Sequence, residues 1–157
     1  MNDTSLHLSR GIVGAIRAKV SICHRERIPA GNKIIVVSNH RSLFDAPLLI
    51  AAMNRPVRFA CHYYMGRVPL LREMVSVMGA FPLDAPSRRQ KNFFRQALKL
   101  LRSGQPVGVF PEGAKPMIER NAPEQLNPFH RGFAHLALRA PMDDLAILPV
   151  AIASIDE

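Results

Sequence analysis

The sequence predicts an α/β domain with a largely parallel central sheet, flanked by helices and preceded by an N-terminal amphipathic helix. Two observations support this fold. Short apolar or β-branched runs alternate with segments whose apolar residues have helical spacing. Proline and glycine lie between these segments, as short turns require. Strands that alternate with crossover helices are typical of a parallel sheet.

The N-terminal segment over residues 6–20 is the first predicted helix. Its apolar positions include Leu6, Ile12 and Ile16, and basic residues lie between them. Two interpretations are open: a surface helix packed on the domain, or a helix that lies in the bilayer interface and is attracted by anionic headgroups. We expect residues 1–24 to form this amphipathic segment and residues 25–157 to form the main domain.

From residue 34 onward, strands and helices alternate. We expect strands at residues 34–38, 57–60, 80–83, 106–110 and 146–152. We expect helices at residues 46–53 and 66–78, from a cap at Ser87 to a stop at Gly104, and at residues 131–139. The proline-rich loop over residues 111–128 is long for a compact domain and is expected to contact substrate. Because a parallel sheet disfavours a bare final strand, we expect the chain to be trimmed or incomplete.

Composition limits the class of protein. The chain has 157 residues, 48% of them hydrophobic, which is enough for the core of one domain. Its net charge of +9 attracts nucleic acid, an anionic bilayer or a phosphorylated molecule alike. Its two cysteines have no zinc or disulfide spacing. Every apolar run is shorter than the roughly 20 residues of a spanning helix, and no secretory signal is visible, so we expect a cytoplasmic protein.

Two short motifs carry the chemistry: His40 with Asp45, directly after the first strand, and Phe-Pro-Glu-Gly at residues 110–113, after a later one. A histidine with a pKa of about 6.5 can take a hydroxyl proton at neutral pH. A carboxylate can orient its ring and stabilise the imidazolium. We predict that His40 is the general base and Asp45 its partner. In the alternatives, Asp45 only caps the helix that follows, and His40 is a loop histidine without a role.

These motifs, in this order, resemble the sequence blocks of the glycerophospholipid acyltransferases, the family that includes the lysophosphatidic acid acyltransferases. The resemblance covers residues 34–152, with a second block at residues 79–84 and a fourth at residues 147–152. It implies transfer of a fatty acyl group to the hydroxyl of a lysophospholipid, 1-acylglycerol-3-phosphate above all. It also implies no cofactor, because the donor, acyl-CoA or acyl carrier protein, is a co-substrate.

The resemblance further implies an acceptor pocket. Glu112 and Gly113 would help to form it, and Lys115 would contact the acceptor phosphate. Ala85 stands where the family's second block has an arginine that holds this phosphate.

Arg88 and Arg89 are the candidates to replace that arginine, because guanidinium groups bind phosphate in a planar fork. The alternative is a simple pair on the helix surface. Pro149 interrupts the last strand, in the segment that resembles the fourth block, and predicts an edge strand or a functional kink.

No pattern typical of a covalent nucleophile is present, so we predict direct transfer from donor to acceptor. We expect backbone N–H groups of the His40 loop to hold the oxyanion. Two other functions stay open: a protein that binds lysophospholipid without turnover, motivated by Ala85, and a basic nucleic-acid-binding domain, which explains only the charge. The expected partners are a lysophospholipid, an acyl thioester and an anionic membrane, at its inner face, and not nucleic acid.

Overall fold

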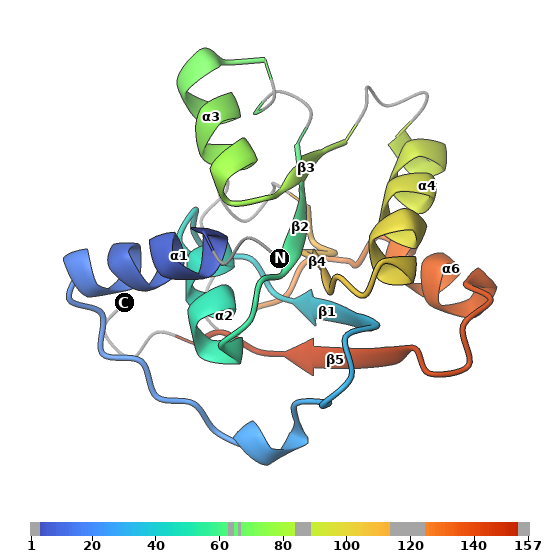
Figure 1. Cartoon of the computed structure of the whole chain (residues 1–157), viewed down its shortest axis with the longest axis horizontal. Coiled ribbons are helices and arrows are strands. Elements are labelled where there is room, and N and C mark those ends of the chain that lie inside the picture. The colour runs from blue at the N-terminus through green and yellow to red at the C-terminus, as the bar shows by residue number, and fades with distance from the viewer. Residues whose placement is uncertain (1–3, 63–64, 66, 84–88, 114–124, 154–157) are drawn as a thin grey trace.

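The computed structural model describes residues 4–62, 65, 67–83, 89–113 and 125–153 (Figure 1). Their strands form one parallel sheet in the order β3-β2-β4-β1-β5. The strands are β1 (Ile34–Ser38), β2 (Arg58–Cys61), β3 (Phe81–Pro82), β4 (Val107–Val109) and β5 (Ala146–Val150). The helices are α1 (Thr4–Ala15), α2 (Asp45–Met53), α3 (Pro69–Val77), α4 (Arg89–Arg102) and α6 (Gly132–Arg139), with a short 3₁₀ turn at Arg25–Arg27. This architecture confirms the predicted α/β fold.

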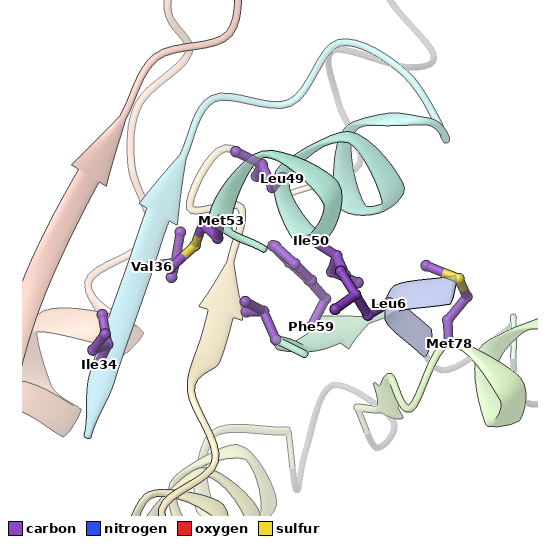
Figure 2. Close-up of a cluster of buried hydrophobic side chains, with 9 residues drawn as sticks. Leu6, Ile34, Val36, Leu49, Ile50, Met53, Phe59 and Met78 are labelled. Atoms are coloured by element: carbon purple, nitrogen blue, oxygen red, sulfur yellow. The ribbon is translucent and has the colours of Figure 1, made fainter. Parts of the chain in front are cut away.

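Helices cover both faces of the sheet, and β1 is buried on each side. Ile34 and Val36 belong to one hydrophobic cluster, whereas Ile35 and Val37 belong to the other. Figure 2 shows the first cluster, which adds Leu6 of α1 and Leu49, Ile50 and Met53 of α2. The second cluster adds Phe93, Ala97 and Leu101 of α4 and Leu136 of α6. A strand buried on both faces needs an unbroken apolar run, which explains the Ile-Ile-Val-Val sequence of β1.

Three local predictions are confirmed. Strand β1 has the expected bounds, and α4 stops just before Gly104, whose φ of 69° lies in the left-handed region that glycine tolerates. Strand β5 lies at the edge of the sheet, where a proline such as Pro149 is tolerated because it costs few ladder hydrogen bonds.

Other elements differ from prediction at their ends. The helix expected over residues 66–78 begins only at Pro69, and the strand expected over residues 80–83 is reduced to Phe81–Pro82. Strands β2, β4 and β5 and helices α2 and α6 differ from their expected bounds by one or two residues at one or both ends. The predicted cap, Ser87, lies outside the described residues.

Helix α1 ends at Ala15, earlier than predicted. Its last turn closes through hydrogen bonds from the Arg17 N–H to Gly14 O (3.1 Å) and from the Ala18 N–H to Val13 O (3.3 Å). Arg17 has a φ of 51°, the left-handed conformation that this C-terminal motif requires. Glycine usually takes this position, so an arginine there gave no signal for the helix end.

The apolar side of α1 packs on the domain. Leu6 is buried in the cluster of Figure 2, and Ile12 packs against the same cluster. These two residues therefore follow the packing interpretation of the helix, whereas Ile16 and Val20 lie beyond its end and are exposed. Across the described ranges, no helix has both the length and the apolar character needed to cross a bilayer.

Gly108, in β4, pairs with Phe59 of β2, and a Cβ atom at this position would lie 2.3 Å from Phe59 Cε1. We expect Gly108→Ala to lower the free energy of unfolding by about 1–3 kcal/mol, because the added Cβ would overlap the buried Phe59 ring. Urea denaturation measures the change. Gly31→Ala is the control, since a Cβ there has no atom within 4 Å. Equal stability of the two variants would contradict this steric role.

Candidate active site

The two sequence motifs meet because their strands are neighbours. Strand β1 pairs in parallel with β4, and Val37 lies in register with Val109. The residues that follow each strand therefore emerge at the same edge of the sheet, the carboxyl edge at which α/β folds place their sites. This places His40 beside the segment over residues 110–113.

Asp45 gathers the His40 loop around its carboxylate. Its Oδ2 atom lies 2.8 Å from His40 Nδ1 and accepts hydrogen bonds from the backbone N–H groups of Ser42 (2.8 Å) and Arg41. Its Oδ1 atom accepts the Ser42 hydroxyl at 3.1 Å. Because a carboxylate only accepts, Nδ1 of His40 carries the ring proton, and Nε2 is left as the basic atom.

The charge of Asp45 follows from a balance of opposing effects. Burial raises the pKa of this carboxyl group, but the hydrogen bonds from the His40 ring and from the Ser42 and Arg41 N–H groups outweigh it. The pKa of Asp45 therefore lies below its ordinary value, and the group is ionised at neutral pH. An ionised partner stabilises the imidazolium that forms when His40 takes a proton.

The interpretation of Asp45 as a helix cap is wrong. Helix α2 begins at Asp45 itself, Phe44 occupies the N-cap position, and no side chain caps the helix. The Asp45 carboxylate turns back toward the preceding loop, where its hydrogen-bond donors lie.

The imidazole of His40 is also held across its face. Its ring stacks on Phe110 with a centroid distance of 4.0 Å and an interplanar angle of 9°. Phe110 stacks in turn on Phe59 at 5.0 Å. The ring is thus fixed by a hydrogen bond in its plane and by an aromatic column that reaches the sheet. Sequence reasoning assigned Phe110 only to a motif, because stacking between neighbouring strands leaves no local pattern.

Glu112 is buried and joins two loops. Its Oε1 atom accepts the backbone N–H of His40 (3.1 Å). Its Oε2 atom accepts the backbone N–H (2.8 Å) and the side-chain amide (3.3 Å) of Asn127. Gly113, with a φ of 72°, closes the turn after it through an N–H bond to Phe110 O at 3.0 Å. Glu112 therefore sets the position of the His40 backbone.

These contacts correct the expected oxyanion site. The N–H groups of His40, Arg41 and Ser42 all donate to the carboxylates of Glu112 or Asp45. The prediction that N–H groups of this loop hold the oxyanion is therefore wrong for these three.

Asn39 anchors the start of the loop, a role that sequence reasoning missed. Its side-chain amide donates to Ile152 O (2.8 Å), and its Oδ1 atom accepts the Ile152 N–H (2.7 Å). These two hydrogen bonds connect the end of β1 to the residues that follow β5. In the sequence, the one signal for this role was the position of Asn39 next to His40.

Of the remaining predicted site residues, only Pro149 is fully described by the structure. Pro149 is exposed on β5 and pairs in register with Val37. Arg89 begins α4, but its side chain lies outside the described part of the structure, as do Arg88 and Lys115.

Comparisons with known proteins give a consistent picture. The profile of the Acyltransferase family matches residues 19–153. A 1-acyl-sn-glycerol-3-phosphate acyltransferase of Borreliella burgdorferi is 27% identical over 135 residues, which cover 85% of this chain and 51% of that protein. The chloroplastic 1-acyl-sn-glycerol-3-phosphate acyltransferase LPAT1 of Arabidopsis thaliana is 26% identical, over 85% of this chain and 36% of that protein.

Among solved structures, the 1-acyl-sn-glycerophosphate acyltransferase PlsC of Thermotoga maritima has the same fold. It aligns with a TM-score of 0.65 and 21% identity, over 92% of this chain and 54% of that one. The chain thus spans about half or less of the length of these relatives.

The lowered pKa of Asp45 predicts how stability depends on pH. A carboxyl group with a lowered pKa in the folded state stabilises the fold above the ordinary Asp pKa of about 3.9, and this contribution disappears as pH falls through the folded-state pKa. We expect Asp45→Asn to lower the free energy of unfolding by roughly 1–3 kcal/mol at neutral pH, and this difference to shrink in acid. Denaturant titrations across this range test it.

Asp143→Asn, at an exposed aspartate, is the matched control for that titration. A difference between the parent protein and Asp45→Asn that stays constant down to the lowest pH would contradict the ionised, hydrogen-bonded state of Asp45.

Proposed function

This chain belongs to the Acyltransferase family, and from that premise we propose that it transfers a fatty acyl group from a thioester donor to the free hydroxyl of a lysophospholipid. The acceptor we propose is 1-acylglycerol-3-phosphate, on which the named relatives act. The observation that carries the proposal is the His40–Asp45 pair, 2.8 Å apart, which leaves Nε2 of His40 as a base.

The chemistry needs one proton transfer in each direction. Nε2 of His40 takes the acceptor's hydroxyl proton as the oxygen attacks the thioester carbonyl carbon. The new C–O bond forms, the C–S bond breaks, and the thiolate leaves. A thiol has a pKa of about 8.5, so the thiolate is a good leaving group and then takes the proton from the imidazolium.

The acceptor phosphate calls for basic groups near the site. We assign this role to Lys115, to Arg88 and to Arg89, the first residue of α4. Arg88 and Arg89 would replace the arginine that the family has where this chain has Ala85. The protein would work at the inner face of an anionic membrane, where its lipid acceptor lies, and the net charge of +9 supports that attraction. Acyl-CoA and acyl carrier protein both fit as donors.

Ala85 favours a second candidate function, a protein that binds lysophospholipid without turnover. Release of free thiol from the donor separates the two functions, because only transfer breaks the C–S bond. An acceptor-dependent thiol signal supports the enzyme, and saturable binding without thiol release supports the binding protein.

We predict that His40→Ala lowers acceptor-dependent thiol release by roughly 10²–10⁴-fold, because it removes the base. The fold should stay intact, because His40 lies in a loop at the carboxyl edge of the sheet. A thiol-reactive dye follows the rate, and circular dichroism checks the fold. His24→Ala, at an exposed histidine, should keep the parental rate. Near-parental turnover in His40→Ala would refute the proposed chemistry.

Glu112→Gln distinguishes positioning from substrate binding. Glutamine keeps one acceptor oxygen, and the two donors of Asn127 favour that oxygen on their side. The NH₂ group then faces the His40 N–H, so the His40 backbone must shift. We expect kcat to fall by about 10- to 10²-fold with the acceptor KM unchanged. A raised KM at constant kcat would instead place Glu112 in the acceptor pocket, as the family resemblance implied. Glu73→Gln, exposed on α3, is the control.

A further inference from the structure

Large apolar side chains are exposed on the two loops that flank His40. Leu43 and Phe44, between β1 and α2, are 55% and 48% exposed, and Leu126 and Phe129, after β4, are 59% and 44% exposed. These four make up the apolar rim. They are four of the ten large hydrophobic residues that are exposed in the described ranges, and each lies within four residues of His40 or two of Asn127, whose backbones share the Glu112 carboxylate.

The rim is held in place by contacts behind it. Glu112 links the N–H groups of His40 and Asn127, one on each loop. Arg41 Nη2 donates to Gln125 O at 3.1 Å, which joins the loops a second time. These hydrogen bonds hold the two loop backbones in a fixed relation to each other and to His40. The four apolar side chains of the rim are carried on these backbones.

The charge of these loops shows which partner they fit. Residues 39–44 and 125–131, the described loop segments that carry the rim, contain Arg41 and Arg131 and no acidic residue. Glu112 of the second loop is buried, and Glu119 and Glu124 lie outside the described residues. An apolar surface with basic residues and no acidic ones is complementary to an anionic bilayer, whose headgroups attract arginine while its acyl region accepts leucine and phenylalanine.

We propose that the apolar rim is the surface by which this protein enters an anionic lipid bilayer, so that His40 faces the lipid phase. This rests on the proposed function, in which the acceptor is a membrane lipid. The acceptor's hydroxyl then reaches Nε2 without leaving the interface, and the transferred acyl chain stays among other chains.

The N-terminal segment is the competing membrane surface. Leu6 and Ile12 of α1 are used in packing on the domain, which leaves Ile16, Val20 and Ile22 exposed beyond the helix. Both surfaces are apolar and basic, and separate variants distinguish them.

Sedimentation with vesicles of phosphatidylcholine and phosphatidylglycerol tests the proposal. We expect the double variant Leu43→Glu with Leu126→Glu to lower vesicle binding about tenfold or more at both low and high salt, because insertion of apolar groups is not screened. Leu138→Glu is the matched control, since Leu138 is 85% exposed on α6, and it should bind as the parent does. Ile16→Glu with Val20→Glu should keep most of the binding.

A fluorescence measurement gives a second reading that does not depend on a loss of binding. The chain contains no tryptophan, so Leu126→Trp adds a single probe to the rim. Its emission should shift to shorter wavelength when vesicles are added, whereas Leu138→Trp should not respond.

The proposal is overturned if the parent protein does not bind these vesicles, if the rim variant binds as well as the parent, or if only the Ile16 and Val20 variant loses binding. It is also overturned if light scattering shows a dimer that the rim variant converts to a monomer, because a second copy would then cover the rim. Thiol release from dispersed substrates without vesicles tests the proposed function separately, so failure of one is distinct from failure of the other.

Discussion

A buried negative charge organises the His40 loop. A carboxylate withdrawn from water must be satisfied by donors within the protein, and the chain supplies them by folding residues 40–42 around Asp45. The same contacts select the protonated nitrogen of His40. One set of hydrogen bonds therefore both satisfies the buried charge of Asp45 and orients the His40 ring. Glu112, which follows the neighbouring strand β4, acts in a similar way. Its two carboxylate oxygens accept the backbone N–H groups of His40 and Asn127.

Sequence reasoning succeeded where the signal was local. The β-branched run of β1 and the glycine after α4 each determine an element through their own residues. The contact between His40 and Asp45 was also within reach, because five positions bring the two side chains together where a loop enters a helix. The role of Glu112 was not, because its partners are backbone N–H groups from distant segments, which leave no trace in residue type. An arginine in the left-handed position likewise concealed the end of α1.

The base is also coupled to the interior of the sheet. His40 stacks on Phe110 and Phe110 on Phe59, and Phe59 lies in the space that Gly108 leaves free. The column passes from the solvent edge into the core through aromatic faces alone. Gly108, in the central strand β4, thus helps to fix the orientation of the His40 ring, although it contacts no reacting atom.

The hydrogen bonds of Asp45 also determine which positions of the loop are free to vary. Its contact with residue 41 is to the backbone N–H, a group that every amino acid except proline provides. At position 42 the hydroxyl adds a bond of its own, and it also accepts the N–H of residue 44. These bonds therefore exclude proline at residue 41 and favour a small hydroxyl residue at residue 42, but they place no requirement on the side chains of residues 41 and 43. For the contact between His40 and Asp45, the number of residues between them therefore matters more than the side chains at positions 41 and 43.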